Sequence, residues 1–243
     1  MKRRLEDNWK RVTDRVAAAC ARCGRAPGSV TIVAVTKSAD TDIIRELIRL
    51  GVVHLGENRV QELARRATEI AEWLAAERSQ GAVKLVTPQW HMIGHLQRNK
   101  VKPVLPHVSL IHSVDSLRLA EELDMHSEKL GRVTPVLLEV NSAGESTKTG
   151  VAVAAALHLA EQLNTLPHLE LRGMMTMAPL TDDQNIIRHA FERTRELYDE
   201  MLHERVGGPK FRELSMGMSN DFELAIEFGA TMVRCRLATR SPL

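Results

Sequence analysis

Short apolar runs alternate with longer amphipathic segments along the chain, and this alternation constrains the possible folds more than any other feature. The apolar runs are typical of buried strands, whereas the segments between them have the spacing of helices with one apolar face. The predicted strands are residues 30–36, 52–55, 91–94, 110–114, 135–141, 171–177, 213–216 and 231–234. The predicted helices are residues 42–50, 60–78, 116–130, 152–163, 183–206 and 219–228, and residues 94–110 have the weakest helical pattern.

Alternation of strands and helices predicts a parallel sheet, because parallel neighbours need a crossover connection, usually a helix. Eight such units favour an α/β fold, the (β/α)8 or TIM barrel. A helix is expected before it, at about residues 4–23, and no linker-like stretch divides residues 1–243, so one barrel domain is the simplest interpretation. An open doubly wound sheet is the alternative, although no GxGxxG motif follows the first predicted strand.

Charge and composition argue against several classes of function. The 243 residues carry 33 basic and 31 acidic side chains, a net charge of +2, which provides no dominant field toward nucleic acid or a membrane. Aromatic residues make up 3% of the chain, too few for a surface that stacks RNA bases. No apolar run approaches the ~20 residues of a membrane span, and no apolar stretch follows the basic N-terminus. A cytoplasmic protein is therefore expected.

The cysteines and histidines form no recognisable disulfide or metal pattern. Three cysteines, an odd and low number, argue against a disulfide framework. Cys20 and Cys23 have CxxC spacing, but they lie near the predicted end of a helix, where an ordinary helix face is expected. His91 and His95 have the four-residue spacing of helical metal ligands, yet the residues between them are predicted as strand, so no metal site is expected.

Lys37 ends the first predicted strand, in VAVTKSA. In a barrel of this kind, functional residues lie where the strands end and the loops to the next helices begin. A lysine there suits Schiff-base chemistry, in which a neutral amine attacks a carbonyl, and burial or nearby cations favour the neutral amine. An ordinary solvated lysine at a strand end is the alternative interpretation.

The stretch SMGMSND, residues 215–221, joins the seventh predicted strand to a helix at the same end of the barrel. Ser219 or Asn220 can cap this helix, and Gly217 lets the backbone approach a ligand closely. Free N–H groups at a helix start also suit a phosphate group. Simple capping without a ligand is the alternative.

Arg234 ends the eighth predicted strand, where it can orient an anion, place a cation against a ring nitrogen or form an ordinary ion pair at the rim. The polar loop NSAGESTKTG, residues 141–150, follows the fifth strand and contains Lys148. This loop is long enough to fold over the rim of a barrel, and a mobile loop with no role in binding is the alternative.

Seven motifs follow one another along the chain, from about residue 30 to residue 234. They are VAVTKSA, HLGENRVQE, WHMIGHLQRNK, IHSVDS, NSAGESTKTGV, LRGMMTMAP and LSMGMSNDFELAI with FGATMVR. Each motif alone is weak, but seven in order are specific. Together they resemble the pyridoxal 5′-phosphate homeostasis proteins, and the resemblance implies a single-domain barrel of fold type III, like the N-terminal domain of alanine racemase.

The resemblance also implies a cofactor and the residues that bind it. Lys37 in VTKSA matches the lysine that holds pyridoxal 5′-phosphate as an internal aldimine. Asn58 in GEN and His91 in WHMIG match positions in the cofactor pocket. Arg234 in MVR matches the arginine that faces the pyridine nitrogen. Because arginine can only donate, it keeps this nitrogen unprotonated and makes the ring a poorer electron sink.

At the phosphate end, the resemblance implies that Ser215 and the turn formed by Gly217, Met218 and Ser219 lie beside the phosphate. After MVR the family continues with Ile or Val, then Gly, then Thr or Ser, whose N–H groups help to bind the phosphate. This chain has Arg236 where the family has the glycine. Either Arg236 supplies charge to the phosphate, or the altered terminus lowers the affinity for the cofactor.

The resemblance implies a protein that binds and supplies the cofactor, without established catalytic turnover and with apo enzymes as possible recipients. A racemase-like enzyme of the same fold type is one alternative, and a barrel that has lost its cofactor is another. A racemase needs a second proton-transfer group, usually a tyrosine from an added domain. The single tyrosine, Tyr198, lies in a predicted helix away from the rim. Without a second domain to link subunits, a monomer is expected.

Overall fold

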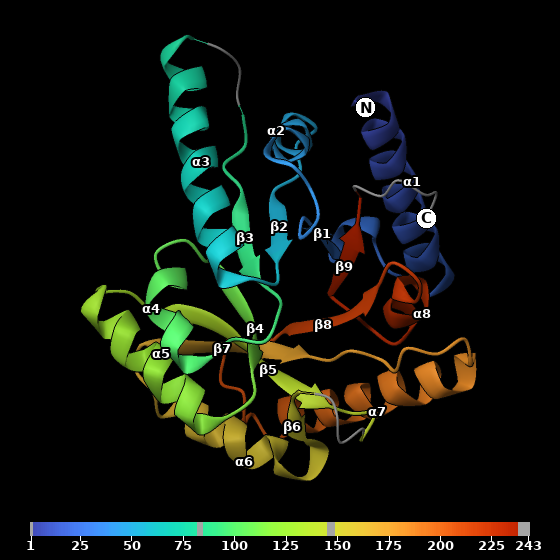
Figure 1. The fold of residues 1–243 in the computed structure, drawn as a ribbon. Helices are drawn as coiled ribbons and strands as arrows, with labels where there is room; N and C mark the ends of the chain where they lie inside the picture. The colour runs from blue at the N-terminus through green and yellow to red at the C-terminus, as the bar shows by residue number, and fades with distance from the viewer. Residues whose placement is uncertain (1, 82–84, 145–148, 238–243) are drawn as a thin grey trace.

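The parallel strands close into a ring in the computed structural model of this protein, which describes residues 2–81, 85–144 and 149–237 (Figure 1). They are hydrogen-bonded in the order β4, β3, β2, β1, β9, β8, β7, β5, and a further pairing between β4 and β5 completes the ring. The predicted (β/α)8 barrel is therefore confirmed. The strands of the ring are β1 Thr31–Val35, β2 His54–Glu57, β3 Gln89–Met92, β4 Leu110–Val114, β5 Thr134–Asn141, β7 Leu169–Met175, β8 Glu213–Met218 and β9 Met232–Arg236.

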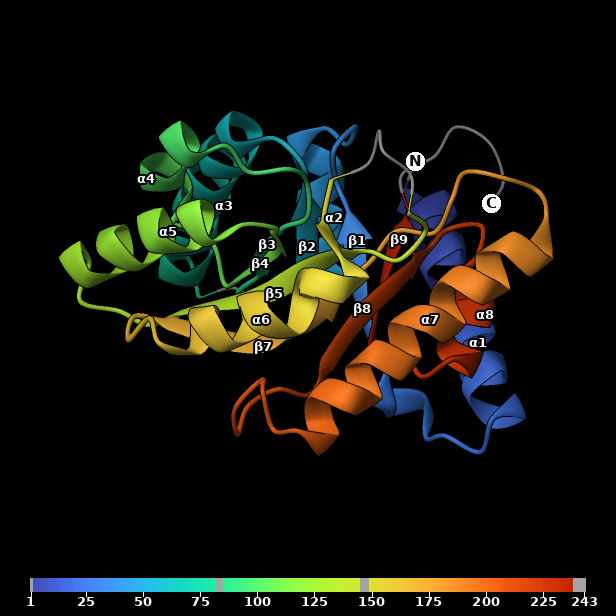
Figure 2. The same ribbon diagram turned by 90° about the horizontal axis from the view of Figure 1, so that it is seen from below.

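Helices surround this ring, as the two perpendicular views in Figures 1 and 2 show. The α-helices are α1 Lys2–Arg22, α2 Thr41–Arg49, α3 Val60–Ser79, α4 Val101–Val104, α5 Leu117–Lys129, α6 Val153–Asn164, α7 Gln184–His203 and α8 Phe222–Glu227. Short 3-10 turns, η1 Pro27–Ser29 and η2 Arg98–Lys100, and the two-residue strand β6 Val151–Ala152 complete the elements. Within the described chain, no helix combines the length and apolar character that crossing a membrane requires.

Several sequence-based boundaries differ from the structure in ways that affect the rim, among them the ends of the sixth, seventh and eighth predicted strands, which lie at Met175, Met218 and Arg236. The second strand continues to Glu57, so Asn58 follows it directly, and the third strand ends at Met92, so Gly94 lies in the loop. Residues 94–110 contain only η2 and the four-residue α4, in keeping with their weak helical pattern. The last helix begins at Phe222 rather than at residue 219, because residues 219–221 form a turn.

The inside of the barrel contains both apolar and polar side chains. Leu110, Leu137, Met175 and Met232 form a small apolar cluster that is separate from the main core between barrel and helices. Side chains two positions apart on a strand point to the same side. Arg234, two residues after Met232, therefore faces the interior, where it is 4% exposed.

A buried ion pair fixes the turn that carries Lys37. Arg66 on α3 is 6% exposed and pairs with Glu57 at the end of β2. Its Nη1 donates to the Thr36 carbonyl at 2.6 Å, and its Nη2 donates to the Ala39 carbonyl at 2.8 Å. Since these carbonyls flank Lys37 on both sides, the Arg66–Glu57 pair sets the path of the chain at the mouth of the barrel.

Replacing Arg66 should be costly, because it leaves the Glu57 carboxylate buried without its cation. We expect Arg66→Ala to lower the free energy of unfolding by about 3–5 kcal/mol. Arg65→Ala is the matched control on the same helix, because Arg65 is exposed and, among the described residues, pairs only with Glu62 and Glu69. It should cost about 0–1 kcal/mol. Urea unfolding followed by circular dichroism measures both, and equal small losses would contradict this role of Arg66.

Candidate functional site

A cavity of about 700 Å³ opens at the carboxyl ends of the barrel strands. Its size lies within the range of small-molecule sites, and its position is the one at which barrels carry their function. The walls come from the ends of β1, β5, β8 and β9 and from the loops after β2, β3 and β7. Lys37, Asn58, Met218, Ser219, Arg234 and Arg236, all predicted from the sequence, line this cavity.

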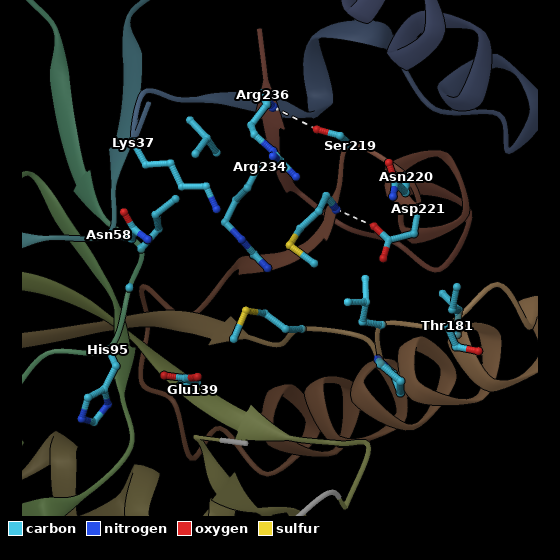
Figure 3. A pocket seen from close by; sticks show the side chains of 18 of the residues that line it. Lys37, Asn58, His95, Glu139, Thr181, Ser219, Asn220, Asp221, Arg234 and Arg236 are labelled. Atoms are coloured by element: carbon cyan, nitrogen blue, oxygen red, sulfur yellow. Dashed lines mark hydrogen bonds between the residues drawn. The ribbon is translucent and has the colours of Figure 1, made fainter. Parts of the chain in front are cut away.

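Lys37 lies in the turn after β1, and its side chain is exposed at the cavity. Figure 3 shows it extended toward Arg234, with Arg236 nearby. The sequence analysis considered a buried lysine, whereas Lys37 is exposed. Its surroundings are instead set by the two arginines that line the same cavity.

Arg234 lies deeper and is held on two sides. Its Nη1 donates to Ser215 Oγ at 2.7 Å, and its Nη2 donates to the Thr176 carbonyl at 2.8 Å. Burial lowers the pKa of Arg234 to about 10, against the raising effect of Asp221 and Glu139. The guanidinium therefore stays charged at neutral pH and presents only donors to the cavity.

The turn between β8 and α8 is organised by its own side chains. The Asp221 carboxylate accepts a hydrogen bond from Met218 N, and Ser219 Oγ accepts one from Arg236 N at 3.0 Å (Figure 3). Neither Ser219 nor Asn220 caps the helix, because Asp221 is the residue that precedes it. The predicted capping role of Ser219 and Asn220 is therefore wrong.

Two glycines determine where the cavity walls lie. Gly217 has φ +91°, and a Cβ there would come within 2.6 Å of Ala225 Cβ on α8. Its role is to let β8 and α8 pack closely, and it does not line the cavity. A Cβ at Gly94 would lie 2.4 Å from the Asn58 carbonyl, so only glycine lets the β2–α3 loop bring Asn58 to the cavity.

His91 and Ser215 lie behind the cavity wall rather than on it. His91 is 2% exposed, and its ring nitrogens contact His54 and His112 at 3.0 and 2.9 Å. Ser215 is fully buried and contacts Arg234 and His112. The structure thus brings neither residue into the cavity that the sequence-based hypothesis assigned to them. His112 lies in the motif IHSVDS but was not named as a candidate site residue.

Two acidic residues, Glu139 and Asp221, also line the cavity, and the sequence analysis did not include them in the candidate site. Glu139 is 2% exposed, and burial raises the pKa of its carboxyl group. Its Oε1 accepts from Thr149 Oγ1 at 2.6 Å, whereas Oε2 has no hydrogen-bond partner among the described residues. Glu139, His95 and Asp221 all line the cavity. Each lies near the carboxyl end of a strand, and this position is the sequence feature from which they could have been predicted.

The loops at the rim contribute in different ways. The connection between β7 and α7 supplies Met177, Pro179, Leu180 and Thr181 to the cavity. Met177 and Pro179 belong to the motif LRGMMTMAP, whereas no motif had pointed to Leu180 or Thr181. The candidate residue Lys148 of the β5 loop lies outside the described residues.

Comparison with known proteins identifies the family. The model of the family described as "Alanine racemase, N-terminal domain" matches residues 3–238. The pyridoxal phosphate homeostasis protein of Aquifex aeolicus is 40% identical over 229 residues, which cover 94% of this chain and 93% of that protein. The chain belongs to the pyridoxal phosphate homeostasis protein family.

Two solved structures extend this assignment. A Bifidobacterium adolescentis protein of unknown function is 40% identical, with a TM-score of 0.89 and coverage of 97% of this chain and 94% of that one. The PipY protein of Synechococcus elongatus PCC7942, solved with PLP bound, is 34% identical, with a TM-score of 0.76 and coverage of 93% and 97%. This member of the homeostasis protein family therefore shares its barrel with a relative whose structure contains the cofactor.

The buried histidines should make the protein sensitive to acid. Burial lowers the pKa of His91 from 6.5 to about 3, so below pH 6.5 the unfolded chain binds a proton that the folded chain excludes. We expect His91 to reduce the free energy of unfolding by up to ~1.4 kcal/mol per pH unit as the pH falls from 6 to 4. His91→Asn should remove this contribution from the slope, as measured by urea unfolding at several pH values.

The control for this experiment is His158→Asn, since His158 lies on the exposed face of α6. This variant should keep the slope of the unmodified protein. A slope that is the same in both variants would mean that His91 takes up its proton equally well in the folded chain.

Proposed function

We propose that this protein binds pyridoxal 5′-phosphate in the cavity at the carboxyl ends of the strands and holds it for the cofactor supply of the cell. The observation that carries the proposal is the meeting of Lys37, Arg234 and Arg236 in one cavity. These three side chains match the three functional groups of pyridoxal phosphate. Lys37 suits the aldehyde, Arg234 suits the ring nitrogen that accepts hydrogen bonds, and Arg236 suits the phosphate. PipY, solved with PLP bound, supports the same ligand.

Lys37 is the group proposed to hold the cofactor covalently. It is the only lysine among the described residues that line the cavity. Pyridoxal phosphate supplies an aldehyde carbon, with which a neutral primary amine condenses with loss of water. The Arg66–Glu57 pair fixes the turn on both sides of Lys37, which keeps the amine at the cavity without burying it.

Arg234 favours a binding protein over an enzyme. Its guanidinium offers donors only, so a ring nitrogen beside it stays unprotonated and withdraws electrons less strongly. Carbanion chemistry at a bound amino acid is then disfavoured. The family name, which refers to homeostasis and not to a reaction, agrees with this role.

The racemase-like alternative lacks a suitable tyrosine in the described structure. Tyr198, the single tyrosine, lies on α7 with its ring stacked on Phe211 at 5.2 Å. Burial raises the pKa of Tyr198 to about 12, and the residue does not line the cavity. Glu139 and His95 are ionisable residues that line the cavity, which makes them the candidates for a second proton-transfer group. Slow racemisation is therefore an alternative that can be measured.

The proposal extends to partners and location. A protein that stores the cofactor must release it to enzymes that lack it, so apo enzymes dependent on pyridoxal phosphate are the proposed recipients. Such recipients work inside the cell, which agrees with the cytoplasmic location expected from the sequence. We also propose a monomer, and sedimentation equilibrium of the purified protein tests that part directly.

Borohydride trapping tests the role of Lys37. After incubation with pyridoxal phosphate and reduction, we expect peptide mapping to find the adduct on Lys37, because no other lysine of the described residues joins the two arginines in the cavity. Lys37→Ala should lose the adduct and its visible absorbance while unfolding within about 0.5 kcal/mol of the unmodified protein, since an exposed side chain adds little to the core.

Lys129→Ala, at the exposed end of α5, is the control and should keep the adduct. An adduct distributed over surface lysines, or one retained in Lys37→Ala, would refute the assignment. Unfolding of Lys37→Ala would show that the lysine is structural.

Arg236 decides between the two interpretations of the altered terminus. Its N–H is already bound by Ser219, so its side-chain cation is what this position offers to a phosphate. We expect Arg236→Gly to weaken pyridoxal phosphate binding about tenfold, the scale of one lost charge-assisted hydrogen bond. Binding of pyridoxal, which has no phosphate, should not change. Tighter phosphate binding by Arg236→Gly would instead show that the arginine is unfavourable there.

A further inference from the structure

Four hydrogen bonds in series cross the inside of the barrel and end on Arg234. Arg234 Nη1 lies 2.7 Å from Ser215 Oγ, which lies 3.0 Å from His112 Nδ1. His112 Nε2 lies 2.9 Å from His91 Nδ1, and His91 Nε2 lies 3.0 Å from His54 Nδ1. Since β7 and β5 separate β8 from β4 in the ring, the contact between Ser215 and His112 spans the interior.

The middle of the series is sealed from solvent, and its two ends lie at opposite ends of the barrel. Ser215 and His112 have no exposed surface, His91 is 2% exposed and Arg234 is 4% exposed. His54, by contrast, is only partly buried and is the first residue of β2, at the end of the barrel opposite the cavity. A continuous polar line thus runs from the amino ends of the strands to the floor of the cavity.

The chemistry of the two ends gives the series a direction. Arg234 can only donate, so Ser215 Oγ accepts from it. If Ser215 also accepted from His112, its own hydroxyl proton would have no acceptor among the described residues. If Ser215 donates to His112 Nδ1, every buried polar atom of the series is satisfied. His112 then donates through Nε2 to His91 Nδ1, and His91 donates through Nε2 to His54 Nδ1.

We propose that Ser215, His112, His91 and His54 form a one-directional chain of hydrogen bonds that positions Arg234 for the cofactor ring, with all three histidines protonated on Nε2. The inference rests on the proposed function, because the cofactor ring is what Arg234 is positioned for. The four residues are positioning residues, which act on the cofactor only through the guanidinium.

Neutral histidines are a condition for this chain. A charged imidazolium donates through both nitrogens, which would interrupt the alternation of donor and acceptor at each ring. Burial lowers the pKa of His91 to about 3 and the pKa of His112 well below 6.5, so both stay neutral near pH 7. Aligned hydrogen bonds polarise one another, which makes Ser215 Oγ a better acceptor for Arg234.

The chain and the Thr176 carbonyl together orient the guanidinium. Thr176 O accepts from Nη2 at 2.8 Å, while Ser215 Oγ accepts from Nη1 at 2.7 Å. Two acceptors on different guanidinium nitrogens fix the plane of the group. The N–H bonds not used by these acceptors can then meet a ligand without first losing another arrangement.

The tautomers provide a direct test. Nitrogen-15 NMR of the full chain, labelled at histidine and without added pyridoxal phosphate, should show His54, His91 and His112 as Nε2–H tautomers at pH 7. An Nδ1–H tautomer at His112, or rapid exchange between tautomers, would overturn the single direction. Because no cofactor is added, this result is independent of whether the protein binds pyridoxal phosphate.

Variants test the positioning role. Ser215→Ala should shift the nitrogen signals of His112, His91 and His54 in turn and release pyridoxal phosphate about 3- to 10-fold faster, the scale of one ordinary hydrogen bond. Ser215→Thr, which keeps the hydroxyl group, should restore the Nε2–H pattern. Ser127→Ala is the control, because Ser127 is equally buried and its hydroxyl group bonds only to Thr134 among the described residues.

The outcomes separate the two proposals. Unchanged His91 and His54 signals in Ser215→Ala would overturn the chain, and release of pyridoxal phosphate at the unmodified rate would overturn its positioning role. If the unmodified protein binds no pyridoxal phosphate although the tautomers are as expected, the proposed function is wrong. The series of hydrogen bonds then exists, but it does not position Arg234 for a cofactor.

Discussion

Arg234 is a permanent cation inside a barrel, and much of the surrounding architecture provides the oxygens that such a cation needs. A buried guanidinium is tolerated only where acceptors or opposite charges meet it. Ser215 and the Thr176 carbonyl provide hydrogen bonds at 2.7 and 2.8 Å, and the carboxyl groups of Asp221 and Glu139 act on the charge through space. The strands on this side of the barrel therefore carry polar groups where barrel interiors are normally filled by branched apolar residues.

Strand β9 shows how one pleated strand provides three layers with different roles. Met232 belongs to the apolar cluster inside the barrel, Arg234 lies at the floor of the cavity, and Arg236 lies exposed at its rim. All three face the same side because they are two residues apart. The same alternation on β4 puts His112 above Leu110, so the polar chain crosses the barrel directly over its apolar cluster.

The order of strands and helices could be predicted from the sequence because apolar period and turn residues are local signals. Lys37 and Arg234 could be assigned to the rim for the same reason, since each lies at the end of a strand. The contact between His112 and Ser215 joins residues 103 positions apart, and the Arg66–Glu57 pair depends on how α3 lies against β2. No local pattern encodes such distances. His91 was consequently assigned to the pocket, although its side chain is directed at two other histidines.

Arg236 illustrates how a strand end can change its ligand chemistry while keeping its backbone. Its pairing with Val35 continues the register of β9 and β1 to the last residue, so the arginine side chain is accommodated without disturbing the barrel. The N–H of Arg236 is bound by Ser219, and the guanidinium lines the cavity. The resemblance implies a backbone N–H donor at this position, and in this chain the position offers the full charge of Arg236. If the protein binds pyridoxal phosphate as proposed, phosphate binding at this end should depend on salt more strongly than binding by backbone N–H groups would, because an exposed charge is screened.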